Sequence, residues 1–190
     1  MTREETRARI VDAAFRSLVD GGYHDTTIKD IADEAGIATG LAHYYFDNKD
    51  DLLLAALERG CPMADIDLSG MSGLEQAELG FAAEKQGQIW NQDAYKLVFD
   101  MVGAAMNNPK ISERIRLYLG TRRELITEIT EAVMKEAPGR PRASSAAIGA
   151  AIWSAFLGIA LQRLIDPDFD GDAAIDAVQE MAGALAGTPR

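Results

Sequence analysis

The sequence predicts an all-α protein, with a small N-terminal head followed by a larger C-terminal helical body. Apolar residues recur at helical spacing along most of the chain, and no run alternates with the two-residue period of a strand. Val, Ile and Thr do not cluster as they do in strands. With 190 residues, 47% of them hydrophobic and 26% charged, the chain is able to bury a core and is not a disordered polypeptide.

The first predicted helix begins with the capping-box pattern Thr2-x-x-Glu5 and ends at Gly21-Gly22, because paired glycines commonly follow a helix C-terminus. Its apolar residues are spaced for one helix face. They are Ile10, Val11, Ala14, Phe15 and Leu18.

Two short helices follow, joined by a turn at Ala35-Gly36-Ile37. The first of them begins at Thr27 with Asp30 in the capping-box position, and the second covers about 39–45. This layout is a helix-turn-helix, whose second helix enters the DNA major groove. On that helix the inward face is Ala42, Tyr45 and Phe46, at i, i+3 and i+4.

A fourth helix, about 48–59, is expected to connect the head to the body, with Asp47 or Asn48 as its cap. Residues 60–73 contain a proline and three glycines without periodicity, which predicts a loop. The body is then expected to hold helices near 74–89, 92–106, 109–136, 143–164 and 172–186.

The charge of the chain opposes a broad electrostatic attraction to DNA. The formal net charge is -11, and residues 1–50 contain six bases and ten acids. Affinity must therefore come from a few well-placed cations, helix N-termini and base contacts, with weak non-specific binding. Arg3, Arg7 and Arg9 fit an N-terminal arm on phosphate and fit a solvated basic face equally well.

Several residues between Thr26 and Leu53 stand at a fixed spacing: Thr26-Thr27, Ile31-Ala32, Ala35-Gly36-Ile37, Gly40, Tyr45-Phe46, Lys49 and Leu52-Leu53. This set resembles the DNA-binding domain of TetR-type (TetR/AcrR) bacterial transcriptional regulators, over about the first fifty to sixty residues. The resemblance implies a helix-turn-helix DNA-binding domain over 1–50 and a helical ligand-binding and dimerisation domain over 60–190.

The resemblance also implies which residues contact DNA. Those expected near phosphate are Thr26, Thr27, Lys29 and Lys49, and those expected to face the groove are Thr39, Gly40, His43 and Tyr44. Leu41 suits contact with a thymine methyl group. Three positions depart from the family pattern. Ala38 replaces a serine cap, so that the cap is expected to pass to Thr39; Ala42 replaces a leucine; and His43 replaces a tyrosine, which predicts a weaker, pH-sensitive phosphate contact.

The helix predicted near 143–164 has a face of small residues and a bulky face for the core, the latter formed by Ile148, Ile152, Phe156 and Ile159. We predict a homodimer through a four-helix interface, two helices from each subunit, as DNA-binding proteins with two-fold symmetry require. The alternative is that both helices pack within one subunit. The predicted interface residues are Ala147, Ala151, Ser154, Ala155, Gly158, Val178 and Met181.

In the resembling family a small-molecule pocket lies among the middle helices. The residues expected to line it for an apolar or amphipathic ligand are Phe81, Trp90, Tyr95, Phe99 and Tyr118, although ordinary core packing explains each one singly. Glu84, Asp93 and Asp100 suit a cationic ligand, or else face solvent.

No membrane partner is expected, because the apolar stretch 146–161 is sixteen residues long, shorter than the ~20 that span a bilayer. The single Cys61 forms no internal disulfide and the N-terminus shows no apolar signal region, which fits the cytoplasm. Neither a metal nor another cofactor is expected.

The resemblance implies a ligand-responsive transcriptional regulator, a repressor that a small-molecule inducer releases from a palindromic double-stranded DNA operator. The alternatives are a helical protein-interaction module without DNA binding and a small helical enzyme. An enzyme is not expected, because the chain lacks HExxH, GxSxG, the phosphate-binding GxxxxGK pattern and a dinucleotide fingerprint. Both histidines, His24 and His43, lie in the head.

Overall fold

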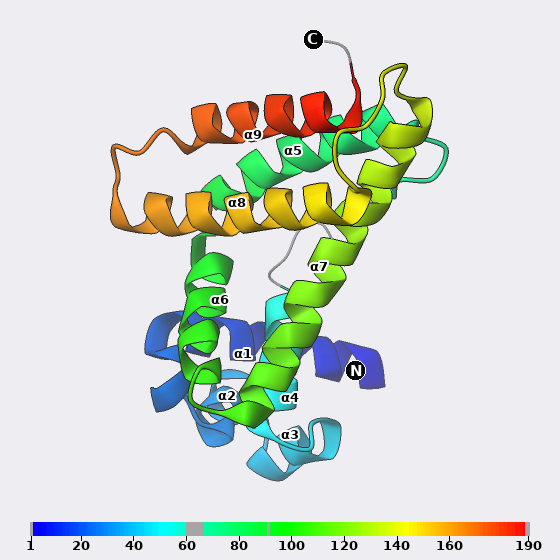
Figure 1. Ribbon diagram of the computed structural model, residues 1–190. Helices are drawn as coiled ribbons and strands as arrows, with labels where there is room; N and C mark the ends of the chain where they lie inside the picture. Colours follow the sequence, from blue (N-terminus) through cyan, green and yellow to red (C-terminus); the bar gives the residue numbers. More distant parts are fainter. Residues whose placement is uncertain (1, 60–66, 91, 189–190) are drawn as a thin grey trace. The chain divides into compact units, whose positions relative to one another are not determined.

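The computed structural model describes residues 2–59, 67–90 and 92–188, without the side chains of 87–90. This part of the chain is helical and contains no strand, which confirms the predicted all-α class (Figure 1). The helices are α1 (Arg3–Asp25), α2 (Ile28–Glu34), α3 (Thr39–Tyr45), α4 (Lys49–Arg59), α5 (Gly73–Trp90), α6 (Gln92–Ala105), α7 (Pro109–Glu136), α8 (Ser145–Ile165) and α9 (Gly171–Ala186).

The chain divides into two compact units. The first contains residues 1–64 and 93–118, and the second contains residues 65–92 and 119–190. Helix α7 belongs to both, since it runs through the boundary at residue 118. By packing, α6 and the start of α7 therefore group with the N-terminal helices. The predicted division into a DNA-binding and a ligand-binding domain concerns function and stays a prediction.

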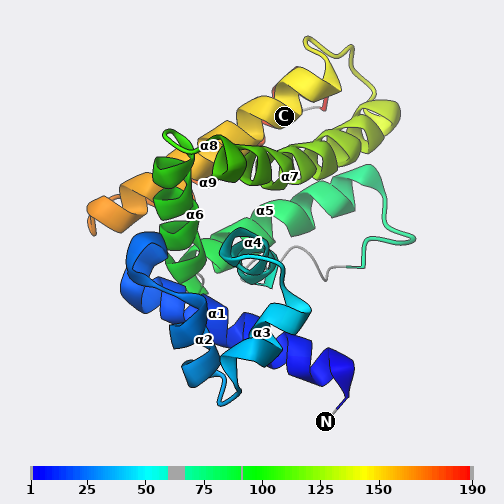
Figure 2. The same cartoon turned by 90° about the horizontal axis from the view of Figure 1, so that it is seen from below.

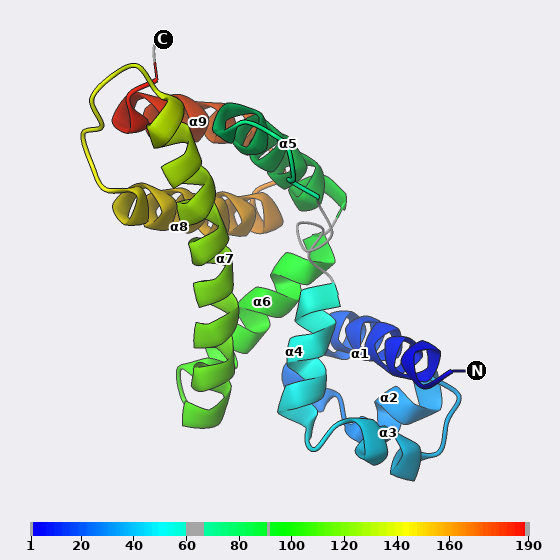
Figure 3. The same cartoon turned by 90° about the vertical axis from the view of Figure 1, so that its right-hand side faces the viewer.

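Helix α1 begins where its sequence predicts but continues to Asp25, beyond the predicted end at Gly21-Gly22. The Glu5 amide donates to Thr2 Oγ1 at 3.1 Å and the Thr2 amide donates to Glu5 Oε2 at 2.7 Å, which completes the capping box. Gly22 has φ +73° and breaks the helix, and one further turn follows. Helix α1 packs on α4 and α2 (Figure 3). The fully buried side chains of this core include Ile10, Leu18, Ile31, Leu52, Leu53 and Leu57.

The connection between α2 and α3 is the tight turn of a helix-turn-helix (Figure 2). Thr27 caps α2 together with Asp30, and Gly36 adopts the left-handed φ of +62° that ends the helix. The Ile37 amide then donates to the Ala32 carbonyl at 3.0 Å. One expectation is wrong: Ala38 itself occupies the N-cap of α3 and no side chain caps this helix, so the cap does not pass to Thr39.

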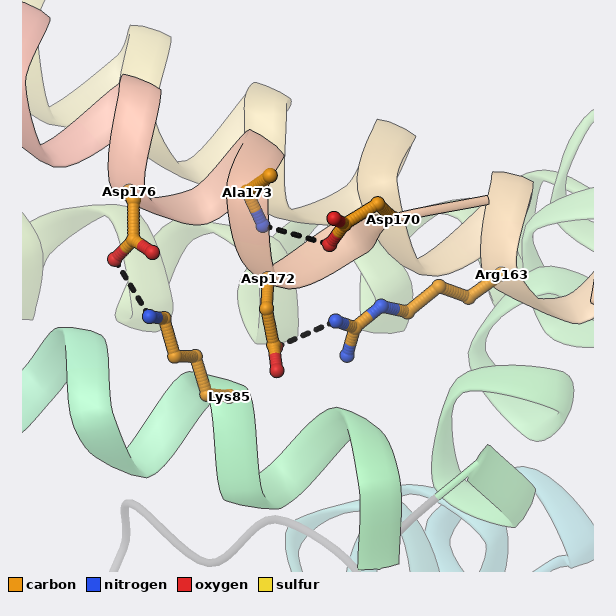
Figure 4. Close-up of polar contacts among 6 residues, drawn as sticks. All are labelled: Lys85, Arg163, Asp170, Asp172, Ala173 and Asp176. Atoms are coloured by element: carbon orange, nitrogen blue, oxygen red, sulfur yellow. Dashed lines mark hydrogen bonds and ion pairs between the residues drawn. The ribbon is translucent and has the colours of Figure 1, made fainter. Parts of the chain in front are cut away.

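The second unit is held by an apolar core between α5, α7, α8 and α9. It includes Phe81, Trp153, Phe156 and Ile175. Helices α8 and α9 pack side by side, and polar contacts fix the start of α9 (Figure 4). Asp170 caps α9 by accepting from the Ala173 amide at 2.9 Å. Two ion pairs join neighbouring helices: Arg163 with Asp172 at 2.6 Å and Lys85 with Asp176 at 2.5 Å.

Helix α8 is long and apolar enough, by length and composition alone, to cross a membrane, and it is the one such helix in the described part of the chain. The helix has 21 residues and contains the sixteen-residue apolar stretch 146–161. Packing accounts for part of this composition, because Ile148, Ile152, Phe156 and Ile159 are buried in the core of the second unit, while 39% of the apolar window is buried in all. The uncovered side carries small residues and, toward the end of the helix, the exposed Leu161 and Ile165.

Candidate nucleic-acid interface

Helix α3 presents one face to solvent and buries the other. Ala42 is 1% exposed and Phe46 is 6% exposed, so these two residues anchor the helix on the core of the head. Tyr44 is 66% exposed and Leu41 is 39% exposed, and His43 is also exposed. The helix therefore offers an aromatic hydroxyl, an imidazole and an apolar side chain on its outer face, which are groups able to contact base edges or a thymine methyl group.

The backbone of α3 is accessible where the chain has its smallest residue. Gly40 is exposed, and a Cβ atom built on it would meet no heavy atom within 4 Å. Thr39 is half-buried beside it at the first position of the helix. The predicted groove-facing residues therefore lie together on one short helix, and their contact with DNA stays a prediction.

The predicted phosphate contacts at the start of α2 differ in accessibility. Thr27 and Lys29 are exposed. Thr26 is 4% exposed, and its hydroxyl lies within hydrogen-bond distance of the Ser17 carbonyl at 3.0 Å and the Gly22 carbonyl at 2.8 Å. The Thr26 hydroxyl therefore stabilises the bend of α1 at Gly22, and the predicted contact of Thr26 with phosphate stays a prediction.

Lys49 is partly buried against Tyr23. Its ammonium group donates to the Tyr23 carbonyl and lies 4.3 Å from the centroid of the Tyr23 ring. Burial lowers the pKa of Lys49, although the carboxylates of Asp50 and Asp100 act in the opposite direction. A phosphate would have to compete with these internal contacts, so the predicted role of Lys49 on DNA stays a prediction.

The contacts of Tyr23 extend to α6. The Tyr23 amide donates to Asp100 Oδ2 at 2.5 Å, and the Tyr23 hydroxyl donates to Asp50 Oδ1 at 3.2 Å. Burial, followed by the Asp50 carboxylate, raises the pKa of Tyr23. Residues on α4 and α6 thus hold the bend of α1 in place, a connection that the sequence analysis did not predict. We call Tyr23, Lys49, Asp50 and Asp100 the Tyr23 network.

Two arginines of α1 lie against aromatic rings at the end of α3. The guanidinium carbon of Arg3 is 5.7 Å from the Tyr44 ring centroid, and that of Arg7 is 5.1 Å from the Phe46 ring centroid. Their spacing of four residues along α1 was visible in the sequence, but the rings that they cover were not. These contacts bring positive charge from α1 to α3.

The predicted pocket residues do not form one cluster within either unit. Phe81 belongs to the second unit and packs edge-to-face on Phe156, with 5.5 Å between ring centroids. Tyr95 and Phe99 stack on one another in the first unit at 6.4 Å. Tyr118, 8% exposed, is also in the first unit, whereas the side chain of Trp90 lies outside the described residues. A ligand role for this group stays a prediction.

The three acidic residues considered for a cationic ligand have different surroundings. Asp93 forms an ion pair with Lys96 at 2.9 Å on the surface of α6. Asp100 accepts from the Tyr23 amide. Glu84 is 7% exposed, in the second unit. Only this last carboxylate combines burial with a place beside the apolar core, on the same helix as Phe81.

Most of the predicted dimer residues lie on an uncovered surface of the second unit. Ala147, Ala151 and Ser154 are exposed, Ala155, Gly158 and Val178 are half-buried, and Met181 is 58% exposed. A Cβ atom built on Gly158 would meet nothing within 4 Å. The apolar surface continues through Leu161 and Ile165, which are 46% and 78% exposed. We call this surface of α8 and α9 the α8–α9 face.

The N-terminal part of the sequence matches the family model described as "Bacterial regulatory proteins, tetR family" over residues 10–56. Over 55 residues the sequence is 46% identical to the HTH-type transcriptional regulator HbdR of Aromatoleum sp. strain CIB. The matched segment is 29% of this chain and 24% of that protein. Over 51 residues it is 45% identical to the HTH-type transcriptional regulator BetI of Brucella anthropi, and this segment is 27% of this chain and 26% of that protein. The chain thus matches about a quarter of the length of these curated relatives.

The fold is shared over nearly the whole chain. A TetR transcription regulator from Haloarcula marismortui superposes with a TM-score of 0.75 at 23% identity, covering 96% of this chain and 97% of that one. A transcriptional regulator from Saccharomonospora viridis in complex with choline superposes with a TM-score of 0.68 at 21% identity, covering 96% of each. At this level of identity the likeness concerns the fold. These relatives are described as transcriptional regulators and not as enzymes.

Proposed function

Because the chain is a TetR-type protein, with the N-terminal sequence and the helical fold of that family, we propose that it is a ligand-responsive, DNA-binding transcriptional regulator of the cytoplasm. In this proposal it represses by binding an operator and leaves it when a small molecule binds. The observation that carries the proposal is the outer face of α3, where Leu41, His43 and Tyr44 are exposed on a helix anchored by Ala42 and Phe46.

The outer face of α3 has the chemistry for base recognition. Tyr44 and His43 are able to donate to base edges or phosphates, and Leu41 suits a thymine methyl group. The open side of Gly40 lets the groove approach the backbone. Thr27 and Lys29 stand at the start of α2, where phosphate contact fixes the register of a helix-turn-helix.

A dimer would place two copies of α3 on a palindromic operator. The α8–α9 face supports this arrangement, because it is apolar, uncovered within one chain and lined by small residues that admit a facing helix. Replacing Ala151 and Gly158 with arginine should convert a dimer into a monomer in light scattering at micromolar concentration. Arginine at the exposed Met106 of the first unit is the control. A wild-type protein of monomer mass would refute the dimer.

The proposed ligand is an apolar or amphipathic molecule that carries a positive charge. Glu84 supports this chemistry, because the residue is 7% exposed and lies about one helical turn from Phe81, which belongs to the apolar core. The regulator from Saccharomonospora viridis is in complex with choline, which is a small cation of this kind. Release would follow from a population shift, and about 3 kcal/mol of coupling weakens operator binding about a hundredfold.

The DNA-binding proposal is tested with Tyr44→Ala, assayed by the retention of duplex DNA recovered from a random pool. Tyr44 is exposed, so the variant keeps its fold and should lose most of its affinity. Leu74→Ala removes an exposed apolar side chain from the second unit and is the matched control. Equal binding by both variants and the wild type would show that α3 does not read DNA and would favour a protein-interaction module.

A further inference from the structure

We propose that Arg3 and Arg7, which we call the arginine pair, form a phosphate-binding element beside α3 and supply much of the electrostatic attraction of the head for DNA. This inference rests on the proposed function and adds residues that the helix-turn-helix itself does not contain. It answers a difficulty raised by the composition, since a head richer in acids than in bases must concentrate its usable charge at a few positions.

Most other cations of the first unit are already engaged. Arg16 pairs with Glu34 at 2.9 Å, and Arg59 pairs with Asp12 at 3.0 Å. Arg114 pairs with Asp51. A cation that neutralises a neighbouring carboxylate contributes little net field at the DNA surface. These three arginines are therefore poor candidates for phosphate binding.

Two more cations of the head are held by contacts or burial within the head itself. Lys49 has its ammonium group on the Tyr23 carbonyl and ring. Arg9 is half-buried, and its Nε atom is buried without a hydrogen-bond partner among the described residues, so this part of the guanidinium faces the interior. Of the three N-terminal arginines, Arg9 therefore belongs to the packing of the head, whereas Arg3 and Arg7 remain exposed.

The arginine pair is positioned at α3. Residues four apart lie on one helix face about 6 Å from each other along the axis. Arg3 lies over the ring of Tyr44, whose outer face we propose contacts DNA, and Arg7 lies over Phe46, one turn away. Both guanidinium groups are thus held at the side of the recognition helix and not in free solution.

The aromatic contacts also fit the chemistry of phosphate binding. A guanidinium near an aromatic ring is attracted through the face of the ring, while its N–H groups stay available at its edge. Those edge donors match phosphate oxygens in a two-point geometry. The first turn of α1 also contains two acidic residues, Glu4 and Glu5, close to the arginine pair in sequence. The Glu5 carboxylate is directed to the capping box, where it accepts from the Thr2 amide. We therefore assign the pair to backbone phosphates and not to bases.

The test is the salt dependence of binding by Arg3→Ala, Arg7→Ala and the double variant, measured by fluorescence anisotropy between about 50 and 200 mM salt. The probes are the duplex recovered from a random pool and a random-sequence duplex. Each single variant should reduce the slope of log affinity against log salt by about 0.9 and the double variant by about 1.8, on both probes. The double variant Arg16→Ala/Arg59→Ala removes the same charge from engaged positions and should change the slope little.

A slope in the double variant that equals that of the wild type would overturn the inference. So would an affinity loss confined to the selected duplex, because that outcome assigns the arginines to base recognition. Thermal melting of each variant separates binding from folding, since exposed arginines should leave the transition in place. If the wild type binds neither probe, the proposed function fails instead, and the two failures are distinguishable.

Discussion

Removing the Asp100 carboxylate should destabilise the bend of α1. Asp100 lies on α6 and accepts from the Tyr23 amide at 2.5 Å, directly after the non-helical Gly22. In Asp100→Ala the Tyr23 amide loses this acceptor. The bend at Gly22 interrupts the hydrogen-bonding pattern of the helix, so α1 is not expected to supply a replacement. The Tyr23 network would also lose a negative charge near the Lys49 ammonium group.

The size of the effect follows from the kind of bond. A hydrogen bond to a charged group contributes about 1.5–3 kcal/mol, and the lower end applies here because the site is only partly buried. A loss of about 1.5 kcal/mol lowers the melting temperature of a chain of this length by about 3–6 °C.

Circular dichroism of wild type and variant measures this shift, and hydrogen exchange should show faster exchange of the Tyr23 amide. Asp93→Ala is the matched control, because it removes a carboxylate from the same helix that pairs with Lys96 on the surface. Such exposed pairs contribute about 0.2–1 kcal/mol. If Asp100→Ala and Asp93→Ala melt together, the Asp100 bond does not stabilise the head.

Three further predictions concern the same elements. Gly36→Ala should cost at least about 1 kcal/mol in urea denaturation, because Gly36 has φ +62°, and an unchanged midpoint would contradict this. Gly149→Ala should cost about 1–3 kcal/mol, since its Cβ would lie 2.6 Å from the Thr127 hydroxyl of α7. Gly158→Ala has open space and should instead stabilise one chain by about 0.5–1 kcal/mol, because alanine is favoured over glycine inside a helix; equal melting of the two variants would refute the contrast. Hydrogen bonds from Thr27 lower the pKa of Asp30, so the stability that this contact adds is present above the unfolded pKa of about 3.9 and is lost as the pH falls through the lower folded value. The difference in melting temperature between the wild type and Thr27→Ala should therefore shrink in acid, and a constant difference would contradict the assignment.

Local signals in the sequence predicted the helices well. The capping box at Thr27 and Asp30 and the glycine at 36 mark the ends of α2, and α3 covers the predicted 39–45. Such signals act within a few residues of the backbone, so they can be recognised without knowing the fold. They fail where a cap is absent, as at Ala38.

Contacts between distant residues could not be predicted in the same way. The Tyr23 amide and Asp100 are 77 residues apart, and helical spacing identifies a face without identifying its partner. For this reason Lys49 was expected on phosphate although it lies on Tyr23, and the arginine pair was left undecided. The predicted pocket aromatics fall into different compact units for the same reason.

The most direct test of the account is selection of duplexes from a random pool by the purified wild-type protein. We predict enrichment of one short sequence present twice as an inverted repeat, because two copies of α3 are related by two-fold symmetry in the proposed dimer. A folded protein that enriches no sequence over the starting pool would contradict the central claim that α3 reads DNA.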